Sequence, residues 1–207
     1  TGREPSVMAL LAGRVIAGDA AGLWTATSDD SLEFTQADVR EDVSVPMEIS
    51  EVLKFGHRAG GGLYVVTAEG LVHSHEHTFF RSPLSELIAP PRVRSLNAVG
   101  LGVDEQLWVA FETHTEVFTN GKSATLKLDD LPPADFAAGL KVGTGFVGIG
   151  ADLYIVQLEP ARAAKRLEGV GKVHSSIWSD GALVMATDDR VIVATTEGTI
   201  DVTQFEL

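Results

Sequence analysis

The chain has 207 residues, 44% hydrophobic and 22% charged, which is enough for one sizeable domain or two small ones. Sixteen basic residues against 29 acidic ones give a net charge of −13, which argues against nucleic acid and anionic membrane surfaces as partners. Cysteine is absent, which excludes disulfides, thiolate catalysis and cysteine-ligated metals, and no apolar run approaches the roughly 20 residues of a membrane-spanning helix.

Five hairpins of β-type sequence recur along the chain. Each consists of four residues, a turn of four or five, and four more; they lie at 14–26, 63–74, 107–118, 153–164 and 183–194. The second position is large or β-branched in every copy: Val15, Tyr64, Trp108, Tyr154 and Val184. This pattern is typical of strands packed between two sheets, so we expect both tyrosines to be core residues.

Further strand-like runs flank the hairpins. One precedes each hairpin, at 7–11, 51–56, 93–100, 139–145 and 173–178. A fourth run follows most of them, at 31–36, 77–82, 124–128 and 199–205, and in the fourth copy 164–169 is a weak candidate. Hairpin starts are about 42 residues apart on average, the length of a four-stranded propeller blade.

The repeat predicts an all-β fold: a single five-bladed β-propeller of four-stranded antiparallel blades. The blades are expected at approximately 5–38, 47–84, 92–129, 136–169 and 172–207, in one domain over 1–207. The segments 37–46, 85–92 and 128–135 are rich in turn formers and charge, and the last two contain proline pairs, so they are expected to connect blades. Whether the five copies close a ring or belong to a larger ring completed by another chain stays open.

Two hairpins resemble those of a known superfamily. In 10–34, Gly18, Gly22, Leu23 and Trp24 match the first part of a sialidase-like BNR/Asp-box blade, and Thr27, Asp29 and Phe34 match the second part loosely, with Ser31 where glycine is usual. Ser74, Glu76, Thr78 and Phe79 repeat the form in the second copy. The resemblance, which extends to propellers of the photosystem II stability/assembly-factor type, implies fold more than function, and it slightly favours an extracytoplasmic location.

Basic and amide groups gather on the predicted innermost strands. Propellers bind ligands at the channel mouth, which the first strand of each blade lines. The candidate ligand-binding residues there are Lys54, His57, Arg58, Arg94, Asn97, Lys141 and His174. They would suit a small anionic ligand or an acidic peptide. The alternative is that these side chains pair with nearby carboxylates.

Three histidines alternate in the second copy. On a strand, His73, His75 and His77 would share one face and could hold zinc or nickel. Alignment with the Asp-box, however, puts Glu76 and His77 in a turn between outer strands, where side chains no longer alternate between two faces. The favoured interpretation is a solvated edge that discourages sheet-to-sheet pairing. The pairs Asp129/Asp130 and Asp188/Asp189 lack the alternating oxygen ligands of a calcium loop.

No catalytic constellation stands out. The sialidase resemblance implies a tyrosine nucleophile, but Tyr64 and Tyr154 occupy the bulky repeat position, and no carboxylate pair marks the innermost strands. The glycine-rich 142–150 lacks the helix that a nucleotide-binding motif requires. The favoured prediction is a non-catalytic recognition or scaffold module that binds a protein partner, or a neighbouring domain of a longer chain, through loops and channel mouth. The alternatives are a sugar- or small-anion-binding propeller and a metal-dependent enzyme using the three histidines.

Overall fold

The computed structural model describes residues 5–27, 33–128, 131–159 and 161–204, with only the backbone described for residue 27 and residues 161–164. Apart from two short 3-10 turns, η1 (Pro90–Arg92) and η2 (Gly102–Asp104), the regular structure is strand. Within the described residues, no helix is long and apolar enough to cross a membrane. The chain divides into two compact units, and each is described by itself: unit 1 is Thr1–Phe55 with Gly61–Val93, and unit 2 is Gly56–Gly60 with Arg94–Leu207.

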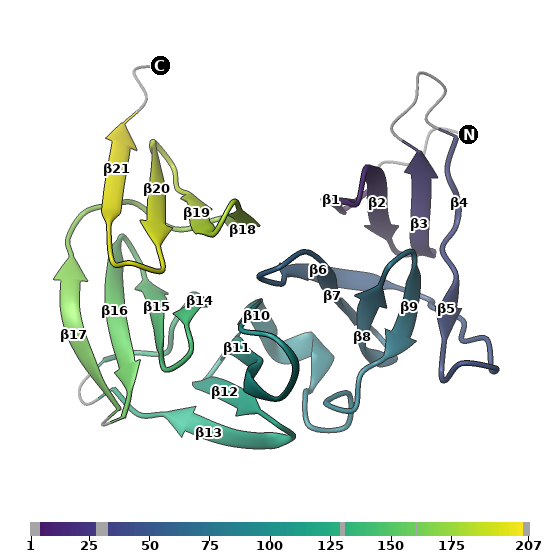
Figure 1. The fold of residues 1–207 in the computed structure, drawn as a ribbon, viewed down its shortest axis with the longest axis horizontal. Helices are drawn as coiled ribbons and strands as arrows, with labels where there is room; N and C mark the ends of the chain where they lie inside the picture. Colours follow the sequence, from purple (N-terminus) through teal and green to yellow (C-terminus); the bar gives the residue numbers. More distant parts are fainter. Residues whose placement is uncertain (1–4, 28–32, 129–130, 160, 205–207) are drawn as a thin grey trace. The chain divides into compact units, whose positions relative to one another are not determined.

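Unit 1 contains the first two blades (Figure 1). Blade 1 is an antiparallel sheet in the order β1-β2-β3-β4: β1 (Val7–Leu11), β2 (Arg14–Asp19), β3 (Gly22–Thr27) and β4 (Thr35–Gln36). Blade 2 has the order β6-β7-β8-β9: β6 (Val52–His57), β7 (Leu63–Thr67), β8 (Gly70–His75) and β9 (Thr78–Arg81). The first four residues of β6 belong to unit 1 and the last two to unit 2.

Blade 2 carries a fifth strand that the sequence did not predict. Within the expected link 37–46, β5 (Val39–Arg40) pairs parallel with the outer strand β9, Val39 opposite Phe79. Val39 is buried, and a short antiparallel turn follows it, closed by the bridge between Arg40 and Pro46. The link therefore covers the free edge of blade 2, as natural sheets commonly do.

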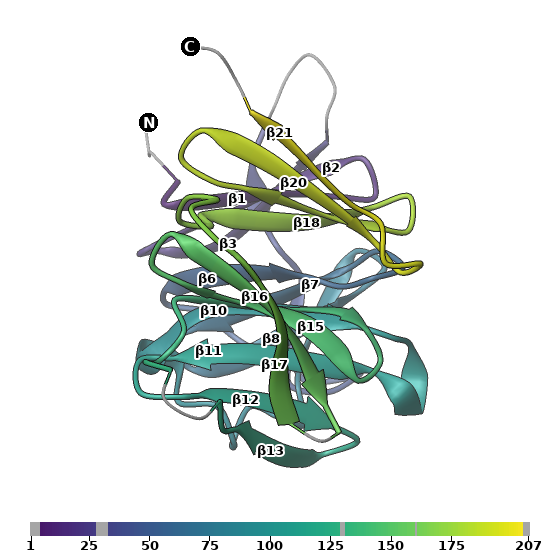
Figure 2. The same ribbon diagram turned by 90° about the vertical axis from the view of Figure 1, so that its left-hand side faces the viewer.

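Unit 2 contains blades 3, 4 and 5, whose sheets follow one another in Figure 2. Blade 3 consists of β10 (Val93–Val99), β11 (Gln106–Phe111), β12 (Thr115–Thr119) and β13 (Lys122–Leu126). Blade 4 consists of β14 (Phe136–Lys141), β15 (Thr144–Ile149), β16 (Asp152–Leu158) and β17 (Ala161–Leu167). Blade 5 consists of β18 (Ser175–Ser179), β19 (Ala182–Ala186), β20 (Arg190–Thr195) and β21 (Ile200–Gln204).

In the fourth copy the predicted order of strands within the blade is wrong, although the predicted limits of the blade, 136–169, enclose all four strands. The hairpin at 153–164 was expected to be the central pair, but it is the outer pair β16–β17. The central position belongs to β15, within the glycine-rich 142–150, and the first strand is β14, which begins in the apolar run at 136–140. Any two neighbouring antiparallel strands can give this apolar pattern, so the pattern alone does not show whether a hairpin consists of the first, the central or the outer strands of a blade.

Apolar side chains fill the space between neighbouring blades within each unit. In unit 1, Ile16 and Leu23 of blade 1 share a core with Val65 and Phe79 of blade 2. In unit 2, one core joins Trp108 and Val117 of blade 3 to blade 4, and another joins Phe136 and Phe146 of blade 4 to blade 5. At the second position of the repeat, Tyr64 and Trp108 are buried as predicted, whereas Val15, Tyr154 and Val184 are half-buried, so Tyr154 is not the core residue that was expected.

Glycines of blade 4 make room for Trp108, which is fully buried. A Cβ atom on Gly139 would lie 2.2 Å from Cγ1 of Val99 and 2.9 Å from Nε1 of Trp108. A Cβ atom on Gly145 would lie 2.8 Å from Cη2 of the same indole. Glycine is required at these positions because the indole lies directly against the blade 4 backbone.

The described residues thus form five antiparallel blades of the β-propeller type, which confirms the predicted fold class. The organisation of 1–207 as a single domain stays a prediction.

Candidate functional site

Asn97, predicted to bind a ligand, is fully buried on β10. Its Nδ2 donates to Oγ of Ser176 over 2.8 Å, and its Oδ1 accepts from Nε1 of Trp178 at 3.2 Å. Both partners belong to β18, so the amide joins the first strands of blades 3 and 5. These bonds give Asn97 a structural role inside unit 2.

Three of the other predicted residues have acidic partners. Arg58 forms an ion pair with Glu105, and both side chains are largely shielded from solvent. Arg94 and Asp135 are 2.8 Å apart, and His174 bonds Asp188, both on the exposed surface. The hydrogen bond from His174 is the main reason that the pKa of Asp188 lies below its usual value. These contacts match the alternative in which the cations pair with nearby carboxylates.

The last three predicted residues differ in exposure. Lys54 and His57 are half-buried on β6, and burial lowers the pKa of His57. The imidazole is therefore neutral at pH 7. Lys141 is exposed at the end of β14. Lys54 belongs to unit 1 and the other six residues belong to unit 2, and their gathering at one channel mouth stays a prediction.

The histidines of blade 2 occupy different surroundings. His73 lies on β8 against Tyr64, with ring centroids 6.1 Å apart. His75 is exposed at the end of β8 and meets the ring of Phe80 edge-on. Glu76, at φ 54°, and His77 form the turn to β9, as the Asp-box alignment predicted. In the part of the chain that the structure describes, no group of three His, Asp or Glu residues is placed to hold a metal ion.

An exposed apolar cluster lies on two adjacent connections in unit 2. The loop cluster consists of Leu101 and Val103, between β10 and β11, and Val142, between β14 and β15; their exposed fractions are 68%, 74% and 52%. A Cβ atom on Gly100 would lie 3.3 Å from Cγ2 of Val142, so the two connections touch. Three exposed aliphatic side chains on two touching connections are a candidate interaction surface.

The connections that carry the loop cluster are held by hydrogen bonds. The backbone N–H of Gly143 donates to Oε1 of Gln106 over 2.8 Å, and the carbonyl of Gly143 accepts from the N–H of Leu158 at 3.0 Å. Two predicted residues border the cluster: Lys141 precedes Val142, and Arg58 bonds Glu105 at the end of the first connection. The connection that carries Val142 is thus hydrogen-bonded to two neighbouring strands, and charged residues border the cluster.

Sequence reasoning missed the loop cluster, although a signal was present. Leu101, Val103 and Val142 each neighbour a glycine with positive φ, which marks a turn rather than a strand. Polar residues are usual in turns, so aliphatic residues there had no obvious structural purpose. In the sequence they were assigned to strands or left without a role.

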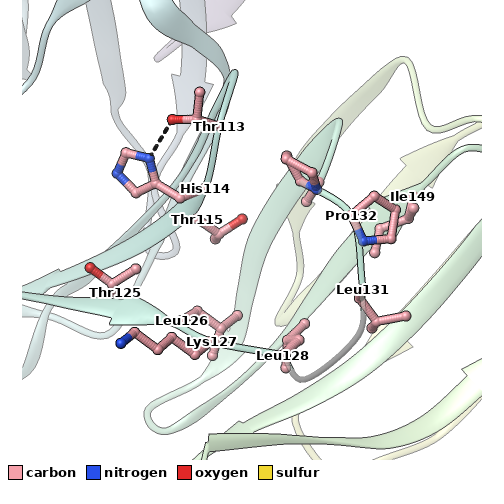
Figure 3. Close-up of a pocket in the computed structure, with 12 residues that line it drawn as sticks. Thr113, His114, Thr115, Thr125, Leu126, Lys127, Leu128, Leu131, Pro132 and Ile149 are labelled. Carbon is pink, nitrogen blue, oxygen red and sulfur yellow. Dashed lines mark hydrogen bonds between the residues drawn. The ribbon is translucent and has the colours of Figure 1, made fainter.

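A pocket of about 380 Å³ opens between the outer part of blade 3 and blade 4 (Figure 3). Its lining comes from the β11–β12 turn, β12, β13, the link to blade 4 and Ile149 of β15. Leucine, proline, isoleucine and alanine side chains form about half of the wall surface; polar groups come from Thr113, His114, Thr115, Thr125 and Lys127. The predicted Asp129/Asp130 pair lies outside the described residues, as does Asp29 of the Asp-box-like hairpin.

His114 is a fixed part of the pocket wall. Its Nδ1 lies 2.9 Å from Oγ1 of Thr113, and its Nε2 lies 3.2 Å from Oε1 of Glu116. Its ring stacks on Phe111, with centroids 4.9 Å apart. Both ring nitrogens are therefore occupied, and the imidazole contributes a flat surface rather than a free donor.

No protein-family model and no curated protein matches the chain. Solved structures do. The chain is similar to the Cps50 (Swd1) β-propeller domain of Myceliophteria thermophila, with 9% identity, TM-score 0.59, and 96% of this chain and 68% of that one covered. It also resembles virginiamycin B lyase from Staphylococcus aureus, with 10% identity, TM-score 0.54, and 97% and 69% covered.

A third similar structure is the extracellular domain of BT4673 from B. thetaiotaomicron, with 10% identity and TM-score 0.53. The match covers 96% of this chain but spans only 30% of that one. One of the three is titled a lyase and another a propeller domain without a stated activity, so the likeness assigns no function. What the comparisons show is the fold: this chain is built as a β-propeller.

Proposed function

We propose that the protein is a non-catalytic recognition module that binds a protein partner through connections on one end of its blades. The loop cluster is the observation that carries this proposal. Leu101, Val103 and Val142 would each lose exposed apolar surface on binding, and the hydrogen bonds of Gly143 hold the surface in place beforehand. An ordered apolar centre with a charged rim is the usual composition of a protein interface.

The finer sequence predictions take a secondary place in this proposal. Arg58 and Lys141 would contribute to the rim, whereas Asn97 is bound inside unit 2 and would not meet a partner. The resemblance to Asp-box propellers is compatible with a recognition role, as is the similarity of this chain to chains in the structures of the mitotic checkpoint complex and the nidogen/laminin complex. A neighbouring domain of a longer chain would be recognised by the same chemistry.

The experiment compares partners that co-purify with the tagged protein and with variants. Val103→Asp places a charge at the centre of the loop cluster and, because Val103 is 74% exposed, leaves the core intact. We expect proteins enriched by the parent to be lost with Val103→Asp. Binding of the identified partner is then measured with purified components, where an affinity loss of about tenfold or more is expected.

The matched control is Val43→Asp, which changes another exposed valine, 79% exposed, in unit 1. This variant should keep the partner. Thermal melting of both variants checks that each is folded. If purified partner binds Val103→Asp as tightly as it binds the parent, the loop cluster is not the binding surface and the proposal fails.

A further inference from the structure

The pocket between blades 3 and 4 has the composition of a small-molecule site rather than of a packing defect. Its wall exposes apolar and polar groups in about equal measure, and the apolar part includes Leu126, Leu131, Pro132, Ala134 and Ile149. Its volume of 380 Å³ lies within the ordinary range of ligand pockets. At about 30 Å³ for each water-sized group, the pocket has room for about ten to twelve non-hydrogen atoms.

Thr115 places a hydroxyl at this apolar wall. The residue is only 5% exposed, and among the described residues its side chain makes no hydrogen bond. Figure 3 shows its oxygen directed toward the space between the β12–β13 wall and Pro132. The oxygen faces the pocket, so a ligand with an acceptor oxygen would take the hydrogen bond of this hydroxyl in place of water.

Lys127 supplies a positive charge on the same wall. Its side chain is exposed and, within the described residues, has no ion pair. In Figure 3 it extends along the side of the pocket that Thr125 and Leu126 form. The carboxylate beside the pocket, Glu116, meets Nε2 of His114. The neighbouring histidine is thus already engaged by a carboxylate, and the lysine is the group available to a new anion.

We propose that this pocket binds a small aliphatic carboxylate of about eight carbons. The hydrocarbon chain contacts the leucine, proline and isoleucine side chains, and the carboxylate accepts hydrogen bonds from the Thr115 hydroxyl and the Lys127 ammonium. The site is separate from the loop cluster and shares no residue with it, so this inference goes beyond the protein-partner function and is tested independently of it.

The test is calorimetric titration of the purified chain with sodium octanoate, 1-octanol and octylamine, three probes that share one chain and differ in the head group. We expect octanoate to bind with one site, octanol at least about tenfold more weakly, and octylamine not at all. Amide chemical shifts of Thr115 and Ile149 should move with octanoate, and those of Leu101 and Val103 should not.

Two variants test the contacts of the ligand's carboxylate separately from those of its hydrocarbon chain. Thr115→Val keeps the shape but removes the hydroxyl, and Lys127→Gln removes the charge; each should weaken octanoate binding about five- to tenfold. The matched controls are Thr119→Val on β12 and Lys122→Gln on β13, neither of which lines the pocket. They should bind octanoate like the parent.

Filling the pocket provides a second readout. Ile149→Trp should abolish octanoate binding while the melting temperature stays close to that of the parent, because Ile149 is only half-buried at the end of β15. The proposal is overturned if octanoate does not bind, if octanol or octylamine binds equally well, or if Thr115→Val and Lys127→Gln bind octanoate like their controls.

Discussion

Asn97 donates from Nδ2 to Oγ of Ser176 over 2.8 Å, and this bond connects β10 to β18, two strands that lie 79 positions apart in the sequence. The same amide accepts from the indole of Trp178. Few side chains can both donate and accept in a fully buried position, and the amide does both here. The amide of Asn97 therefore serves packing within unit 2.

Replacement of Asn97 should destabilise the protein. Asn97→Leu keeps the approximate volume but leaves the Trp178 N–H and the Ser176 hydroxyl without their partner, so we expect a loss of about 2–3 kcal/mol in the free energy of unfolding. Ser176→Ala removes only one of the two bonds and should cost about 1 kcal/mol. Urea unfolding measures both. Equal losses for the two variants would show that the Trp178 bond contributes nothing.

Gly139→Ala should be more damaging than its small size suggests. The added methyl group would meet Val99 and the Trp108 indole at 2.2 and 2.9 Å, so blade 4 must shift away from blade 3. We expect a loss of about 2–3 kcal/mol in the free energy of unfolding and a change in tryptophan fluorescence. Gly148→Ala, in the same blade, would meet its nearest neighbour, Cβ of Phe136, at 3.2 Å and should cost less.

His57 should make the protein less stable in mild acid. Burial lowers the pKa of His57 in the folded state, whereas the unfolded chain takes up this proton near pH 6.5. Between the folded pKa and pH 6.5 the unfolded state binds more protons, so this contribution to stability falls as the pH falls. As the pH falls from 7.5 to 5.5, the free energy of unfolding of His57→Gln should therefore fall less than that of the parent. His77→Gln, in an exposed turn, is the control and should track the parent.

Two aspartates that pair with arginines, the exposed Asp38 and the half-buried Asp152, should respond differently to loss of those arginines. The pKa of Asp152 is lowered chiefly by the backbone N–H of Gly169 and next by Arg166, whereas that of Asp38 is lowered chiefly by Arg40. Arg166→Met should therefore leave the pKa of Asp152 below its ordinary value. Arg40→Met should instead raise the pKa of Asp38 most of the way back to its ordinary value. Carboxyl NMR titration measures both. In each parent pair the stabilisation is present above about pH 4 and is lost as the pH falls through the folded pKa.

The repeat in the sequence was sufficient to predict the blades because both faces of a central strand are buried. Trp108 and Tyr64 were recognisable as core residues on that ground. The positions of the strands within the fourth blade could not be read from the pattern, since the third strand, β16, has the apolar sequence of a second strand. β5 was also unpredictable: two residues form no period, and only the pairing of Val39 with Phe79 makes them a strand.

The candidate sites were less accessible to sequence reasoning than the fold. Basic residues on the first strands were identified, but their partners are distant in the sequence: Glu105 lies 47 positions after Arg58, and Asp135 lies 41 after Arg94. The pocket depends on the approach of the link at 131–134 to β12 and β13, which composition does not encode. Thr115 in particular looks like an ordinary strand residue until its hydroxyl is seen without a partner.

The placement of the tryptophans has a practical consequence. The chain contains three, Trp24 in unit 1 and Trp108 and Trp178 in unit 2. Trp108 is sealed against glycine backbone, whereas Trp24 is half-buried and donates from Nε1 to Asp19. Single-tryptophan versions of the protein would therefore carry an intrinsic fluorophore in one unit or the other. Their emission during heating would reveal, without any attached dye, whether the two units melt together or in succession.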